Sequence, residues 1–180
     1  MSSADPGAPR VRPADVEGWF AEHGLETLER ADREVITSWD LVLDGHRRFD
    51  LRVTVILDPA LGLICWAHYA PPISDLFRKS YRRMLRWNDE FPFAKFAISE
   101  DERPLLVVEV PREAADADTL GLALARIVGI ADALFDETTD WLWIGGRVPD
   151  QSDRRTRNAN LIERYMERLP ELFGAPVGPE

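Results

Sequence analysis

The sequence predicts an α+β protein in which helices pack on a twisted, mainly antiparallel sheet of five strands. The first observation is an alternation of apolar and polar residues in several stretches, which is typical of strands with one buried face. The second is a set of stretches with apolar residues every three or four positions, which is typical of amphipathic helices. The third is the order of these stretches, α-βββ-α-ββ-α, with one more helix near the C-terminus.

The N-terminal part of the chain is expected to form a flexible leader and then a short helix. Residues 1–12 are rich in Ser, Pro, Gly and Ala, a composition that disfavours packed structure. Pro13 suits the first position of a helix, and Gly24 suits the position just after its end. Between them, three large apolar residues fall at helical spacing: Val16, Trp19 and Phe20.

Residues 34–70 are expected to form three antiparallel strands. The first two strands alternate, and Asp44-Gly45 between them is typical of a two-residue hairpin turn. A second turn ends at Gly62, and Leu63 to Tyr69 forms a more apolar third strand. The alternating positions are Val35, Thr37, Trp39, Leu41 and Leu43 in the first strand, and Phe49, Leu51, Val53, Val55 and Leu57 in the second.

The second helix is expected to begin near Ser74, which can act as its N-cap, and to end at Asn88, shortly before Pro92. One side of this helix is apolar, and the opposite side carries a basic stripe of Arg78, Lys79, Arg82, Arg83 and Arg86. This stripe is either a solvated face balanced by acids of neighbouring elements or a docking surface for an acidic peptide or a phosphate backbone.

A hairpin and two further helices are expected to complete the chain. The stretches Phe93–Ser99 and Leu105–Val110 alternate as two strands around an acidic turn. The remaining expected elements are a third helix over residues 119–135, an irregular segment over 136–153 and a last helix over 154–173.

The third helix carries small residues at four-residue spacing: Gly121, Ala125, Gly129 and Ala133. We call this row of small residues the seam. Helix propensity does not explain it, because each glycine inside a helix costs about 1 kcal/mol relative to alanine. Small residues in a row allow another backbone to approach closely. We therefore expect the seam to receive a helix, either the chain's own C-terminal helix around residues 161–169 or the third helix of a second subunit.

The stretch LRWNDEFPFAKFAISEDERPLLVVEVP resembles the bacterial YbjN family of sensory-transduction regulators. Trp87-Asn88 ends a helix, a strand with Lys95 follows, and an acidic turn leads to a second strand and a long apolar helix. The turn Asp101-Glu102-Arg103-Pro104 departs from the family, in which glycine often follows the aspartate. The resemblance covers residues 14–135 and implies the fold of type III secretion chaperones, a dimer and a protein-binding scaffold. The expected domains are a leader over 1–12, a YbjN-like domain over 13–135 and a C-terminal extension over 136–180.

The composition disfavours several classes of protein. The formal net charge of −10 argues against binding to nucleic acid through bulk positive charge. No apolar run approaches the roughly 20 residues that span a bilayer, so no membrane association is expected. The single cysteine, Cys65, excludes an intramolecular disulfide and favours a cytoplasmic location.

No set of residues indicates catalysis, so we expect no enzymatic activity, no cofactor and no metal. Cys65 and His68 have a C-x-x-H spacing, but these positions of a strand project to opposite faces and cannot readily share a zinc ion. The acidic residues are dispersed, as charges that solvate turns and strand ends are, rather than paired for acid–base chemistry. Gly145-Gly146 is too short for a phosphate-binding loop.

Four tryptophans raise the alternative of a ligand pocket: Trp39, Trp66, Trp141 and Trp143. They are interpreted first as core and interface residues, because large aromatic side chains bury much area. The sequence therefore favours a homodimeric, non-enzymatic adaptor or chaperone-like module with an unidentified protein or peptide partner. A small-molecule sensor with a tryptophan-lined apolar pocket is the first alternative, and a nucleic-acid-associated regulator that uses the basic stripe is the second.

Overall fold

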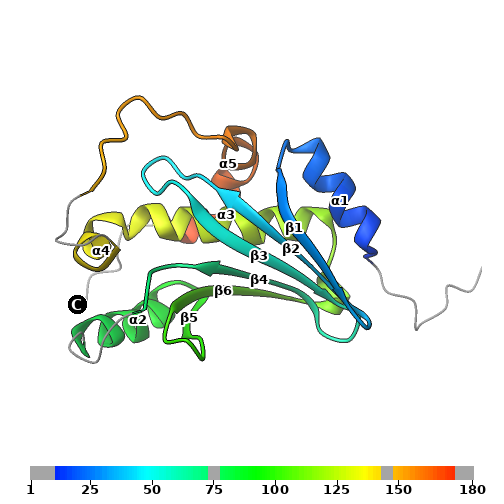
Figure 1. Cartoon of the computed structure of the whole chain (residues 1–180), viewed down its shortest axis with the longest axis horizontal. Coiled ribbons are helices and arrows are strands. Elements are labelled where there is room, and N and C mark those ends of the chain that lie inside the picture. Colours follow the sequence, from blue (N-terminus) through cyan, green and yellow to red (C-terminus); the bar gives the residue numbers. More distant parts are fainter. Residues whose placement is uncertain (1–10, 73–77, 143–147, 173–180) are drawn as a thin grey trace, which may run out of the picture.

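Six antiparallel strands form one sheet in the computed structural model, which describes residues 11–72, 78–142 and 148–172 (Figure 1). The order across the sheet is β1-β2-β3-β4-β6-β5, and each neighbouring pair is antiparallel. The strands are β1 (Thr27–Arg33), β2 (Ile36–Leu43), β3 (Leu51–Asp58), β4 (Gly62–His68), β5 (Lys95–Ile98) and β6 (Pro104–Pro111). The α+β class predicted from the sequence is confirmed, with one more strand than predicted.

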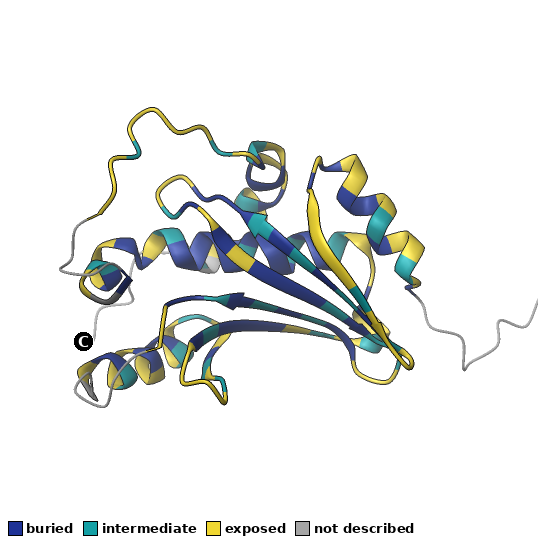
Figure 2. Cartoon of the chain, in the orientation of Figure 1, coloured by how far each residue is buried: buried dark blue, intermediate teal, exposed yellow. Residues whose placement is uncertain are grey.

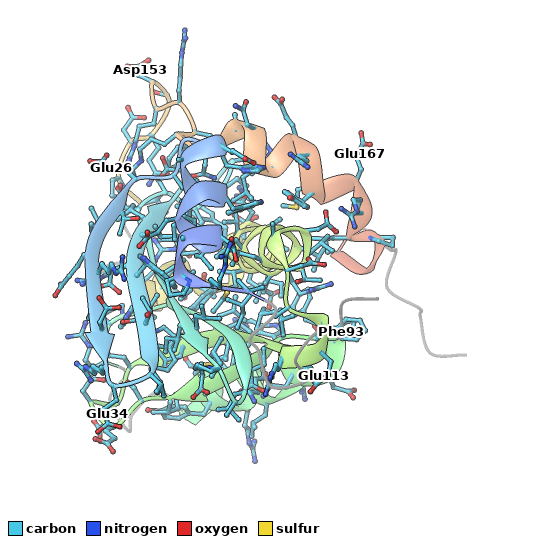
Figure 3. The ribbon with its side chains drawn as sticks, turned by 90° about the vertical axis from the view of Figure 1, so that its right-hand side faces the viewer. Glu26, Glu34, Phe93, Glu113, Asp153 and Glu167 are labelled. Carbon is cyan, nitrogen blue, oxygen red and sulfur yellow. The ribbon has the colours of Figure 1, made fainter. Side chains whose placement is uncertain are left out.

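The helices gather on one side of the sheet, which curves around α3 (Figure 3). The longest helix, α3, lies behind the strands in Figure 1, with α1 and α5 beside it and α2 near the edge formed by β5. Within the described ranges, no helix covers the opposite face of the sheet, and none is long and apolar enough to cross a membrane. The helices are α1 (Pro13–Glu22), α2 (Arg78–Glu90), α3 (Ala117–Ala133), α4 (Phe135–Leu142) and α5 (Ala159–Tyr165), with short 3-10 turns at Arg112–Ala114, Met166–Arg168 and Pro170–Leu172.

The hydrophobic core lies between α3 and the face of the sheet that the helices cover. Along β2, every second side chain is buried there, as the alternation in the sequence predicts (Figure 2). The fully buried Leu41 of β2 and Leu124 and Ile127 of α3 belong to this core. Each large apolar side chain buried in this way contributes about 1.5–3 kcal/mol, so the covered face stabilises the fold.

The strand β1, with the sequence TLERADR, is missing from the prediction of five strands. Its side chains are exposed or half-buried, so the sequence shows no alternation there. The strand forms because it pairs with β2 across a tight connection at Glu34 and Val35, where Glu34 adopts a φ of 55°. Charged residues are typical of an edge strand, because they discourage pairing with other chains.

The dipeptide Asp44-Gly45 does not form the predicted two-residue turn. Residues 44–50 form a longer loop, and the carboxylate of Asp132 on α3 holds it in place. Three consecutive backbone N–H groups, of residues 46–48, donate hydrogen bonds to Asp132 over 2.6–3.0 Å. A Cβ atom at position 45 would lie 2.2 Å from Oδ1 of Asp132, so the close approach of helix and loop requires glycine.

The C-terminal part of the chain differs from the prediction in two places. α4 occupies part of the segment that was predicted to be irregular, and within it the hydroxyl of the buried Thr138 donates a hydrogen bond to the carbonyl oxygen of Leu134 over 2.9 Å. α5 begins at Ala159, several residues after the predicted start, because the preceding residues bind the loop of residues 44–50. Two 3-10 turns replace the predicted end of this helix.

Asp44 joins the C-terminal part of the chain to the sheet. Its side chain is buried and accepts hydrogen bonds from Nε and Nη2 of Arg157, each over 2.7 Å. The backbone of Asp44 exchanges two further hydrogen bonds with the side-chain amide of Asn158, over 2.7 and 2.8 Å. Burial opposes ionisation of Asp44, but hydrogen bonds from Arg157 and from the backbone N–H of Asp50 outweigh it, so the pKa of Asp44 lies below its usual range.

Candidate functional site

The uncovered face of the sheet contains a hollow of about 520 Å³, which we call the open-face hollow. Side chains of β1, β2, β3 and β4 form it, on the side of the strands that points away from α3 in Figure 3. Its lining consists of Glu29, Ala31, Arg33, Ile36, Ser38, Asp40, Thr54, Ile56, Asp58, Ile64 and Trp66.

The floor of the open-face hollow is apolar because strand register aligns large side chains across the sheet. Ile56 of β3 pairs with Ile64 of β4, and the next pair on this face is Thr54 with Trp66. Ile36 of β2 lies in the same lining. All four large apolar side chains of the floor are only partly buried. Contact with a partner would therefore remove further apolar surface from water.

The polar part of the hollow centres on Asp40. This carboxylate pairs with the guanidinium of Arg52 and accepts a hydrogen bond from Thr54 Oγ1 over 2.7 Å. Partial burial opposes its ionisation, but the hydrogen bonds from Arg52 and Thr54 prevail, so the pKa of Asp40 is lowered. The hollow therefore holds an ionised aspartate, already paired with Arg52, beside its apolar floor.

Cys65 and His68 lie on opposite faces of β4, as strand geometry predicts. Cys65 is completely buried in the core, and burial raises the pKa of its thiol to about 12. His68 shares the open face with Arg52, and burial together with this cation lowers the pKa of its imidazole. No group of His, Cys, Asp and Glu residues that could hold a metal ion occurs in the described part of the chain.

The tryptophans of the predicted pocket do not share one cavity. Trp39 is buried in the core, where its indole N–H donates to Glu17 over 3.0 Å, whereas Trp66 lies on the open face. Trp141 belongs to α4, and its side chain lies outside the described part of the structure, as does the whole of Trp143.

The basic stripe lies on the exposed side of α2. Lys79, Arg82, Arg83 and Arg86 are exposed, while Arg78 begins the helix and its side chain lies outside the described part. Of the four described side chains of the stripe, Arg83 has a hydrogen bond, in which its Nη1 donates to the backbone oxygen of Glu137 over 3.0 Å. The stripe therefore stands apart from the open-face hollow, which α2 does not line.

The seam of small residues on α3 lies against the chain's own C-terminal segment. A Cβ atom at Gly121 would be 2.2 Å from Cζ of Tyr165, and one at Gly129 would be 2.7 Å from the ends of Met166 and Leu172. Ala125 is also buried, whereas Ala133 at the end of the seam is exposed.

The residues that carry the family resemblance, Trp87-Asn88 and Lys95, meet at the edge strand β5. Trp87 packs on Phe96, with ring centroids 5.3 Å apart. The side-chain amide of Asn88 accepts a hydrogen bond from the backbone N–H of Phe96 over 2.5 Å and donates one to its carbonyl oxygen over 3.2 Å. Lys95 pairs with Glu109 of β6 over 2.9 Å. The pattern thus fixes α2 to the sheet and occupies backbone groups at its edge.

Of the large apolar residues of the open-face hollow, Trp66 was among the predicted pocket residues, whereas Ile36, Ile56 and Ile64 were not predicted from the sequence. A signal for them exists in β3 and β4, where Ile56, Ile64 and Trp66 stand at positions that a strand with one solvated face fills with polar residues. When both the odd and the even positions of a strand carry apolar residues, both faces of the sheet are expected to contact other groups.

Comparison with known families gives one match. The model of the YbjN family, described as "Putative bacterial sensory transduction regulator", matches residues 12–139. This range contains all six described strands, and it ends before the C-terminal segment that covers the seam of α3. No curated protein matches the chain.

Proposed function

The chain belongs to the YbjN family, and we propose that it is a non-enzymatic regulatory adaptor that binds a protein segment at its open-face hollow. One observation carries this proposal: large apolar side chains remain partly exposed on a sheet face that no described helix covers. Apolar patches of this kind, rimmed by polar residues, are typical of sites that bind other proteins. The homodimer that the resemblance to the YbjN family implies stays a prediction, which light scattering would check.

The partner segment would place apolar side chains on Ile56 and Ile64 and polar groups near Asp40. A pull-down from cells that produce the protein tests this, with Ile56→Glu as the variant and Val148→Glu as the control. Val148 is 40% exposed and lies outside the hollow. We expect partners captured by the wild type to be lost with Ile56→Glu and retained with Val148→Glu, while circular dichroism shows that both variants fold. Equal capture by all three proteins, or no specific capture by the wild type, would contradict the proposal.

A second candidate function is the sensing of an apolar small molecule. The observation in its favour is a cleft of about 600 Å³ between the end of α3 and the C-terminal segment, a volume in the range of ligand pockets. Ala133, Ile162 and Met166 contribute to its apolar walls. Ala133→Phe would fill the cleft from its exposed side. Binding of a neutral apolar dye by the wild type and its loss in Ala133→Phe would support this function, and no dye binding would reject it.

A further inference from the structure

We propose that the exposed basic face of α2, formed by Lys79, Arg82, Arg83 and Arg86, binds an acidic segment of a partner protein. This surface is separate from the open-face hollow, so the proposal stands independently of the function proposed above. Its occupant is a segment rich in carboxylates that also carries an apolar residue.

The first argument is that these cations lack the carboxylate partners that eight arginines elsewhere in the described structure have. Arg47, Arg52 and Arg168, for example, each pair with an aspartate. Lys79, Arg82 and Arg86 form no ion pair with any residue that the structure describes, although the chain has 32 acidic residues against 22 lysines and arginines. Arg33 on β1 and Arg155 in the segment before α5 also form no ion pair in the described structure, but the arginines near them in sequence, Arg30 and Arg154, do pair with aspartates.

The second argument is that the cluster opposes the stability of its own helix. Lys79 precedes Arg82 and Arg83 by three and four residues, and both precede Arg86 by four and three residues. Like charges at these spacings repel each other on a helix surface. Glu90, four residues after Arg86, is exposed and forms no ion pair with it in the described structure. A carboxylate from outside the chain would remove this repulsion.

The third argument concerns the shape and composition of the surface. Leu85 is 70% exposed and lies on α2 three residues after Arg82. Arg83 donates a hydrogen bond to the backbone oxygen of Glu137 on α4, which places its guanidinium beside that helix. Guanidinium groups bind carboxylates through two parallel hydrogen bonds, and an apolar side chain of the partner would cover Leu85.

The acidic character of the remaining protein favours a short protein segment over nucleic acid or an anionic bilayer. Both of these carry negative charge over distances far longer than α2, so they would also meet the acidic surface of a chain with a net charge of −10. A short acidic segment contacts only the basic face and avoids this repulsion.

A titration with synthetic peptides tests the proposal. The probe is a fluorescein-labelled helical peptide of Glu and Leu at helical spacing, and the matched probe has Lys in place of Glu. We expect the full-length protein to bind the acidic peptide and not the lysine peptide. The affinity for the acidic peptide should fall as salt is added. The double variant Arg82→Ser, Arg86→Ser is expected to bind about tenfold more weakly. The equal-charge control Arg103→Ser, Arg155→Ser changes two exposed arginines outside both surfaces and is expected to bind within about twofold of the wild type.

Three results would overturn the proposal. The first is no binding of the acidic peptide up to about 1 mM. The second is an equal loss of affinity in the control variant, which would mean that net charge and not the basic face of α2 sets the affinity. The third is binding of duplex DNA, or of vesicles of equal parts phosphatidylcholine and phosphatidylserine, that depends on Arg82 and Arg86 and exceeds binding of the peptide. Thermal unfolding of each variant shows that the comparison is made between folded proteins.

Discussion

The two faces of the sheet use similar residues in different environments, and Leu63 and Ile64 illustrate the difference. They are neighbours in β4, yet Leu63 is completely buried under the helices while Ile64 is half-buried in the open-face hollow. An apolar side chain stabilises a fold in proportion to the area that it removes from water. The covered face therefore holds the molecule together, and the open face keeps apolar area that a partner can still bury.

The largest expected effect comes from changing this pair of neighbours. Leu63→Ala should lower the free energy of unfolding by about 3 kcal/mol, because it leaves a cavity in the core. Ile64→Ala should lower it by about 1 kcal/mol or less, because Ile64 is already in contact with water. Urea unfolding followed by circular dichroism measures both values. Equal losses would show that the open face is covered in solution, for example by a second subunit.

A smaller effect is expected where the C-terminal segment covers α3. In Gly121→Ala the new Cβ atom would meet the ring of the fully buried Tyr165, which cannot move without displacing α5. In Gly129→Ala it would meet only the flexible ends of Met166 and Leu172. We expect a loss of about 2 kcal/mol for Gly121→Ala and less than about 1 kcal/mol for Gly129→Ala.

Thermal unfolding and limited proteolysis distinguish the two glycine variants. In Gly121→Ala, the C-terminal segment should be cleaved faster than in the wild type, because α5 is displaced from its seat on α3. The control, Gly129→Ala, should keep the cleavage rate of the wild type. If both variants behave alike, the packing of Tyr165 on Gly121 does not hold the segment.

A third loss, smaller than those of Leu63→Ala and Gly121→Ala, is expected at Asp44 and depends on pH. Its lowered pKa means that ionised Asp44 stabilises the fold above the ordinary aspartate pKa of about 3.9, and that this stability is lost as pH falls through the lower pKa of the folded protein. Asp44→Asn should cost about 1.5 kcal/mol at neutral pH, since its partner Arg157 is half exposed and the pair is worth less than a fully buried one.

Urea unfolding of Asp44→Asn at several pH values checks this dependence. The difference in unfolding free energy between the wild type and the variant should be constant near neutral pH and should shrink below about pH 4. Comparing the two proteins at each pH removes the contribution of the other carboxylates. A difference that stays constant down to strongly acidic pH would mean that the charge of Asp44 does not stabilise the fold.

The sequence by itself determined the helices and strands in which buried and exposed side chains alternate regularly. The buried positions of α1 recur at the helical period and those of β2 at the strand period, and this recurrence is a local property of the chain. The family resemblance also came from the sequence, because the residues around Trp87-Asn88 and Lys95 are close together in the chain. Their contacts with Phe96 and Glu109 explain why this pattern occurs.

Only the tertiary structure decided the parts that depend on contacts between distant residues. β1 is a strand because β2 pairs with it, although its own side chains show no period. The loop of residues 44–50 replaces a tight turn because Asp132 and Asn158, far along the chain, supply its hydrogen bonds. The open-face hollow likewise exists because register places Ile56 beside Ile64. The contacts of β1 and of the loop leave no local pattern, since each residue involved is ordinary in its own stretch of sequence.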